Sequence, residues 1–408
     1  MALRPRYLIL VYVFTFVWTP GCKNRDEVKP VKPAISPVLA DNKNPPAVTE
    51  VECREFSNRL ETAIIKADGK SLTELIRYDE IVDRSMNGLD IRPEFRRSLI
   101  EKLRNLEAPP FAIPMVSAVQ NGASYKLQRI DVNAKPPRVR MRLAMQGAVN
   151  YHEIHLARRP DGNLVAHDLY VMLSGELISE TSRRGFLLTM PIQPGNAQGT
   201  DREYIDNLQK LVAMTRAHKQ GQFQEAIDQY RQLPQNLQRF KALRLMMITL
   251  ASSVNNEEYL RLVKDFRRDH PDEVAVDLAS LDYFRRTKKY DEYLKSMERI
   301  DKSVDGDAYL HVARAETMIE ADRRDEARTF SEKAVAQDPN LREGYVTRIR
   351  VAMLEKNHQD TQTWLKKEIE KFNTPADLKG MRVNPEFTAF VESPQFQSFE
   401  KRYLAREK

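Results

Sequence analysis

Cysteine is scarce in this chain of 408 residues, which has only Cys22 and Cys53. No spacing of cysteine and histidine suits a zinc site. A disulfide between Cys22 and Cys53 would tie the far N-terminus to the first expected helix, so we expect neither a disulfide framework nor a metal. Cys53 is then expected to be a buried and inert thiol.

Apolar runs long enough to cross a membrane are also missing at the N-terminus. The run Tyr7–Trp18 holds 12 residues, whereas a spanning helix needs roughly 20. It follows Arg4 and Arg6, and a short apolar run behind basic residues is typical of a secretory signal peptide. The sequence therefore predicts export.

Directly after this run, Thr19-Pro20-Gly21-Cys22 resembles the cleavage box of bacterial lipoproteins. The resemblance implies that residues 1–22 form a signal segment and that Cys22 carries lipid. Gly21 and Cys22 match the family pattern, while Thr19 and Pro20 depart from it. A plain secretory signal or an uncleaved anchor remains the alternative. Because Lys23 is not an aspartate, the family's sorting rule implies the outer membrane.

A strong charge of one sign is absent as well. The 65 basic and 58 acidic residues are interspersed and give a net charge of +7, which does not predict a nucleic-acid-binding stripe. A mild preference for anionic membrane surfaces stays open. The chain also lacks a Gly-rich phosphate loop, HExxH, GxSxG and a paired-carboxylate motif, so we expect no cofactor and no enzyme activity.

Residues 23–49 contain five prolines and no periodic pattern. Proline supports neither helix nor sheet hydrogen bonds, so this segment is interpreted as an extended tether that holds the folded part away from the membrane.

Residues 50–190 predict an α+β domain. Three helices are expected first, near residues 50–64, 71–83 and 93–106. Alternation of apolar and polar residues then predicts a strand at 138–145. The turn at 159–163 predicts a hairpin of strands 149–158 and 164–173, and the turn at Ser174-Gly175 leads into a last strand at 176–190, within a sheet of about five antiparallel strands. This order of elements resembles the NTF2-like fold, whose members include small-molecule enzymes and domains with empty or partner-filled pockets.

Two histidines are the pocket candidates of this domain. Simple alternation places His152 with Ile154 and Leu156, and His167 with Leu169 and Val171. A buried pair would suit acid–base chemistry, while a satisfied core histidine is the plainer interpretation. An enzyme or small-ligand binder using this pocket is therefore the alternative function.

Residues 201–373 repeat with a period of 34. Unit starts fall at Asn207, Phe240, Val274, Ala308 and Arg342, and an acid recurs in one register at Glu225, Glu258, Glu292, Glu326 and Asp360. An acid near a helix N-terminus is favoured by the helix dipole. Gln222–Ala226 and Arg324–Ala327 resemble the mid-repeat turn of tetratricopeptide (TPR) units, so a TPR-like solenoid of about five repeats is predicted. The family's small residue in the first helix is kept at Ala315 but replaced by larger residues in the other units, so the repeats are divergent.

The TPR resemblance implies that first helices line a surface that holds proteins or peptides. The residues expected to face it are His218, Lys241, Arg244, Asp282, Arg285, Glu316 and Arg350. Their mixed signs do not predict binding of a chaperone C-terminal tail. Each of them is also compatible with an ordinary solvated surface charge.

Residues 374–408 carry aromatic residues at helical spacing, including Phe396, Phe399 and Tyr403. We interpret this segment as helices that cap the open end of the solenoid. The whole sequence then predicts an exported, membrane-anchored scaffold of the bacterial cell envelope that binds a protein or peptide partner. A purely structural envelope protein is a third possibility.

Overall fold

The computed structural model describes residues 47–89, 91–145, 148–189 and 199–404. The expected signal segment, Cys22 and nearly all of the tether lie outside these residues. The chain divides into two compact units, the first extending to Ala279 and the second beginning at Ser280, apart from a short stretch between two strands. Within the described ranges, no helix is both long and apolar enough to cross a membrane.

Five helices precede the sheet in the described part of the first unit, where the sequence predicted three. They are α2 (Glu50–Ile65), α3 (Gly69–Leu75), α4 (Tyr78–Ser85), α5 (Pro93–Arg104) and α6 (Ala112–Gln120). Thr49 and Glu52 form a capping box at the start of α2, which satisfies two otherwise unpaired backbone donors. The helix expected over 71–83 is wrong as a single element, because the extended backbone at Ile76 ends α3 before α4 begins.

An antiparallel sheet of five strands follows, in the order β1-β2-β3-β4-β5. The strands are β1 (Ser124–Asp131), β2 (Arg138–Met145), β3 (Ala148–Arg158), β4 (Leu164–Val171) and β5 (Glu176–Leu177). β1 lies in a segment to which no strand was assigned from the sequence, although about five strands were expected. This antiparallel sheet followed by helices is an α+β arrangement continued by an all-α region.

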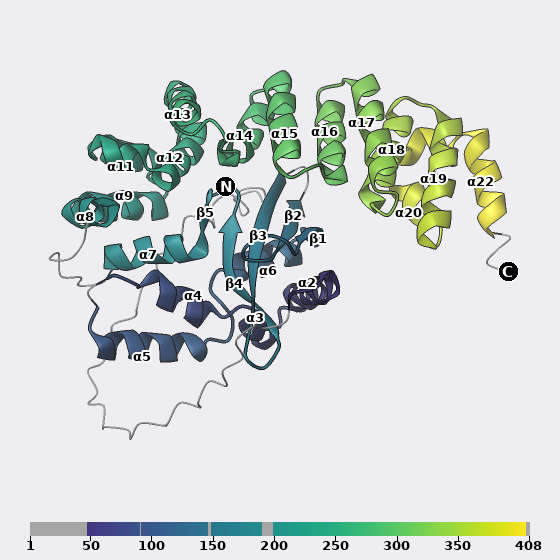
Figure 1. The fold of residues 1–408 in the computed structure, drawn as a ribbon. Coiled ribbons are helices and arrows are strands. Elements are labelled where there is room, and N and C mark those ends of the chain that lie inside the picture. The colour runs from purple at the N-terminus through teal and green to yellow at the C-terminus, as the bar shows by residue number, and fades with distance from the viewer. Residues whose placement is uncertain (1–46, 90, 146–147, 190–198, 405–408) are drawn as a thin grey trace. The chain divides into compact units, whose positions relative to one another are not determined.

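The strand predicted over 176–190 is wrong. Only Glu176 and Leu177 pair with β4, and the chain then forms helix α7 (Ile178–Thr189). Phe186 of α7 is buried in a cluster with Val82 and Leu99, so burial against α4 and α5 favours the helix. Figure 1 shows α4, α5 and α7 lying side by side.

The rest of the first unit is helical. Its helices are α8 (Gly199–Asp206), α9 (Leu208–Lys219), α10 (Phe223–Arg231), α11 (Gln235–Arg239), α12 (Lys241–Val254) and α13 (Asn256–Asp269). Helices α9 and α10 form one hairpin, α12 and α13 form the next, and α10 packs against α12. The short helix α11 was not predicted. Helix α14 (Ala275–Arg286) contains the division between the units.

The second unit continues the hairpin pattern with α15 (Tyr290–Ser303), α16 (Ala308–Glu320), α17 (Arg324–Gln337), α18 (Arg342–Leu354) and α19 (His358–Phe372). Helix α16 packs against α17 and α18, and α18 packs against α19 (Figure 1). Gly344 permits the close approach of α18 to α17, because an added Cβ would lie 3.1 Å from a Val335 methyl carbon. The hairpins therefore stack on one another.

The predicted repeat starts coincide closely with the observed helices. First helices begin at Leu208, Lys241, Ala275, Ala308 and Arg342, each within one residue of the expected position. The acids of the predicted register are each the third residue of a second helix, as Glu326 is in α17 and Asp360 in α19. The period of 34 therefore corresponds to one helical hairpin.

Four short elements follow α19 in the described residues: α20 (Leu378–Val383), η2 (Pro385–Phe387), α21 (Thr388–Val391) and α22 (Pro394–Leu404). Phe390, Phe396 and Phe399 are buried in one cluster with Ile349 of α18 and Leu365 of α19. This cluster covers the apolar side of the last hairpin, which would otherwise face water.

Candidate functional site

His152 is buried in the sheet, with 4% of its surface exposed. Its Nδ1 lies 3.2 Å from the Tyr125 hydroxyl, and its Nε2 lies 3.2 Å from the Asn150 Nδ2. The Asn150 Oδ1 accepts the backbone N–H of Leu173, so its amide nitrogen is the group that donates to Nε2. The proton of His152 is therefore on Nδ1, and both ring nitrogens are engaged.

Burial lowers the pKa of His152 to about 4, because a charged imidazolium would lose its hydration without gaining a carboxylate. A protonated Nε2 would also face the donating amide of Asn150. The ring is thus held neutral and fixed between two neighbours, an arrangement typical of a satisfied core histidine.

His167 occupies a different environment at a bulge in β4. His155 pairs with Asp168 and Leu156 pairs with Ala166, which leaves His167 as the extra residue. A bulge changes which side chains share a face, so the simple alternation expected for this strand does not hold here. Burial, followed by the Arg84 charge, lowers the pKa of His167. No hydrogen bond or ring contact joins His152 and His167 within the described part of the sheet.

The strand positions that alternate with His152 form a charged side of the sheet. Glu153 is buried and accepts hydrogen bonds from Arg140 at 2.5 Å and from Arg138 at 3.2 Å. On the same side of the sheet, His155 of β3 lies opposite Asp168 of β4. The alternating arginines of β2 were visible in the sequence, but Glu153 was not singled out, because its partners come from another strand.

Three partner candidates of the first unit are buried or paired within the chain. His218 is buried, and burial lowers its pKa. The Lys241 Nζ lies 2.8 Å from the Glu273 Oε2. Arg244 is buried and its guanidinium lies 2.7 Å from the Asp269 carboxylate.

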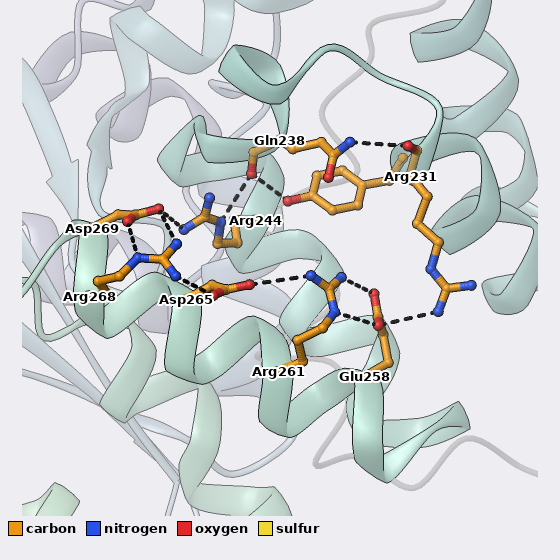
Figure 2. A network of polar contacts seen from close by, with 9 residues as sticks. Arg231, Gln238, Arg244, Glu258, Arg261, Asp265, Arg268 and Asp269 are labelled. Atoms are coloured by element: carbon orange, nitrogen blue, oxygen red, sulfur yellow. Dashed lines mark hydrogen bonds and ion pairs between the residues drawn. The ribbon is translucent and has the colours of Figure 1, made fainter.

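Arg244 belongs to a polar network that joins α10, α11, α12 and α13 (Figure 2). Its Nε donates to the Gln238 carbonyl at 3.0 Å, and the Tyr230 hydroxyl donates to the same carbonyl. Along α13, Arg268 and Arg261 bridge successive acids, and Glu258 also pairs with Arg231 of α10 at 3.2 Å. The network holds two successive hairpins together through charges and does not present Arg244 to solvent.

The candidates of α14 and of the second unit range from partly buried to exposed, and several of them are paired within the chain. Arg286 bonds Asp282 at 2.8 Å, and Arg285 lies 3.6 Å from Glu320. Glu316 is half-buried on α16. The guanidinium of Arg350 lies 3.1 Å from Glu386 in η2, and both side chains are substantially exposed.

Two exposed apolar side chains accompany Arg350 on α18. Val346 is 50% exposed and Leu354 is 37% exposed. They lie four residues before and after Arg350, so these three residues follow one another along the helix. Sequence reasoning named Arg350 and missed its apolar neighbours, although their spacing was readable.

Comparisons with known proteins assign neither a family nor a function to this chain. No family model matches the sequence, and no curated protein matches it. A solved structure titled "MamA MSR-1 C2" aligns with 41% of this chain and 98% of its own, at 16% identity and a TM-score of 0.32. No groups of His, Cys, Asp or Glu arranged to hold a metal occur in the residues that the structure describes.

Proposed function

We propose that the protein is a scaffold whose TPR-like hairpins bind a protein or peptide partner. The stacked hairpins that begin at the predicted positions are the observation that carries this proposal. One hairpin cannot bury its apolar side alone, and stacking within each unit leaves a surface of first helices that is suited to holding extended chains.

Helix α18 is the best candidate for the binding surface. Val346 and Leu354 offer apolar contacts, and the Arg350–Glu386 pair offers exchangeable charged contacts beside them. Exposed charged pairs contribute little to folding, so a partner can replace this one at low cost.

We further propose that Cys22 is lipidated and that the tether links the folded units to the bacterial envelope. The basic, apolar and small residues that end at Gly21-Cys22 support this. In cells fed labelled palmitate, the full-length protein should carry label and a Cys22→Ala variant should not. Equal labelling of both proteins would contradict lipidation at Cys22.

The partner proposal is tested by crosslinking in cells with the full-length protein and Val346→Asp. The matched control is Leu260→Asp, because Leu260 of α13 is similarly exposed at 45%. We expect Val346→Asp to lose the specific partner, since it places a charge in an apolar contact, and Leu260→Asp to retain it. Equal recovery from all three proteins would exclude α18 as the binding surface.

The alternative of an enzyme in the NTF2-like pocket gains no support from His152. Both of its ring nitrogens are engaged by Tyr125 and Asn150. A catalytic base needs one free nitrogen within reach of a substrate.

A further inference from the structure

Glu273, in the turn between α13 and α14, accepts from two different parts of the first unit. The Lys241 ammonium at the start of α12 lies 2.8 Å from its Oε2, and the Tyr170 hydroxyl of β4 lies 3.4 Å from the same atom. The ammonium is also 5.9 Å from the centroid of the Tyr170 ring, within cation–π range. A strand of the sheet thus contacts the first helix of a hairpin directly.

The turn between β4 and β5 presses against this pair. Gly175 in that turn has a φ of +65°, and an added Cβ would lie 3.1 Å from the Lys241 Cε and 3.3 Å from the Glu273 carboxyl carbon. A larger residue would have a strained backbone here because of the positive φ, and its Cβ would displace the Lys241 and Glu273 side chains by a few tenths of an ångström.

A second contact lies at the adjacent residue of the hairpin. The Arg184 guanidinium of α7 is 5.3 Å from the centroid of the Phe240 ring, and the Tyr204 ring of α8 meets the same ring edge-on at 5.9 Å. Phe240 is the N-cap residue of α12. Both residues at the start of α12 are therefore covered by the segment from β4 to α8.

We propose that Tyr170, Gly175, Lys241 and Glu273 form a latch by which the α+β domain occupies the partner surface of the α12–α13 hairpin. This inference rests on the proposed function, in which first helices bind partners. While the latch is closed, Lys241 is bonded within the chain and an external partner is confined to the second unit. Opening the latch exposes the start of α12.

The latch is suited to opening because its polar groups are only partly withdrawn from water. Lys241 and Glu273 keep 29% and 16% of their side-chain surface exposed, so water can replace their bond. A contact of this kind is opened by modest competition, in contrast to the contacts of the Arg244 guanidinium, which keeps only 5% of its side-chain surface exposed.

The test uses the full-length protein and the rate at which an amine-reactive acyl reagent labels Lys241. Gly175→Val should raise that rate at least about fivefold, the factor that corresponds to roughly 1 kcal/mol. Hydrogen exchange should increase together at residues 172–178 and 240–244. Gly162→Val is the matched control, since Gly162 also has a positive φ, +87°, but has nothing within 4 Å of its Cβ position.

Unchanged labelling of Lys241 in Gly175→Val, or faster exchange at 172–178 alone, would overturn the latch. Should Gly175→Val fail to fold, Tyr170→Phe decides, because it removes only the hydroxyl and should raise labelling about twofold. No partner is needed for this readout. Labelling of Lys241 can therefore contradict the latch while crosslinking still supports partner binding at α18. Likewise, crosslinking can contradict partner binding at α18 while labelling still supports the latch.

Discussion

The guanidinium of Arg348 lies 5.3 Å from the centroid of the Trp364 ring, and a lysine, Lys367, lies 4.1 Å from the same ring. The same arrangement occurs 34 residues earlier, where Arg314 and Lys333 each lie 5.8 Å from the Phe330 ring centroid. The period read from the sequence is therefore repeated in side-chain contacts. In each case an arginine from a first helix meets the aromatic residue of its own second helix.

Replacing Arg348 with alanine should lower the free energy of unfolding by about 2 kcal/mol. Arg348 is buried, pairs with Glu332 at 3.0 Å and with Asp360, and packs on the Trp364 ring. Its neighbour Arg350 is the control, because it is exposed and Arg350→Ala should cost less than about 0.5 kcal/mol. Urea denaturation measures the free energy of unfolding of both variants. Equal costs would show that the buried contacts of Arg348 contribute nothing beyond a surface pair.

Stability should fall in acid because of His152. Its pKa is about 4 when folded and 6.5 in the unfolded chain. Above pH 6.5 both states are neutral, so the stabilisation is complete. As the pH falls from 6.5 to 4, only the unfolded chain takes up a proton, and stability decreases by roughly 3 kcal/mol.

The contribution of His152 is isolated by comparing the wild type with His152→Gln at pH 7 and pH 4.5. The variant should show a smaller loss of unfolding free energy between the two values, because glutamine does not titrate. A loss of the same size in both proteins would mean that His152 is protonated in the folded state.

Glu52 should also make the free energy of unfolding depend on pH, by a smaller amount than His152. Bonds from Arg158 at 2.9 and 3.0 Å, with the N–H of Thr49, lower the pKa of Glu52 to about 2. The stabilisation is present above its ordinary pKa of 4.5 and is lost as the pH falls towards 2. Because the carboxylate is well solvated, Glu52→Gln should cost less than about 1 kcal/mol at pH 7.

Thermal unfolding in low and molar salt tests this assignment. The difference in melting temperature between the wild type and Glu52→Gln should become smaller in molar salt, since solvated ion pairs are screened. A difference that salt does not change would point to the helix cap rather than to the ion pair.

Phe399 should be the most sensitive position of the C-terminal elements. It is fully buried against Phe396 and Tyr403, so Phe399→Ala should cost about 3 to 5 kcal/mol. Hydrogen exchange should accelerate in α18, α19 and α22 together. Val383→Ala is the control, because Val383 is 81% exposed and its replacement should change stability by less than about 0.5 kcal/mol.

Much of the helical half was predictable because its signals are local. The starts at Ala308 and Arg342 could be counted from Pro339, since proline ends helices. Glu326 and Asp360 mark the first turns of second helices through the dipole of the same helix. Neither signal depends on distant parts of the chain.

The errors arose where distant contacts decide the conformation. The turn at Ser174-Gly175 led to the expectation of a strand as far as residue 190, yet burial of Phe186 beside Val82 and Leu99 favours a helix over residues 178–189. The extra residue at His167 cannot be seen without knowing how β4 pairs with β3. One inserted residue is enough to change the face on which later side chains lie.

The sequence by itself determined the period of 34, the starts of the first helices in the repeats, and the acids in the first turns of the second helices. Tertiary structure alone decided that His152 is enclosed by Tyr125 and Asn150, that Arg244 is buried in a charged network, and that Lys241 meets Tyr170. The physical reason is one of range. Helix propensity and capping act within a few residues, whereas the burial and charge partners of a side chain depend on segments brought together from far along the chain.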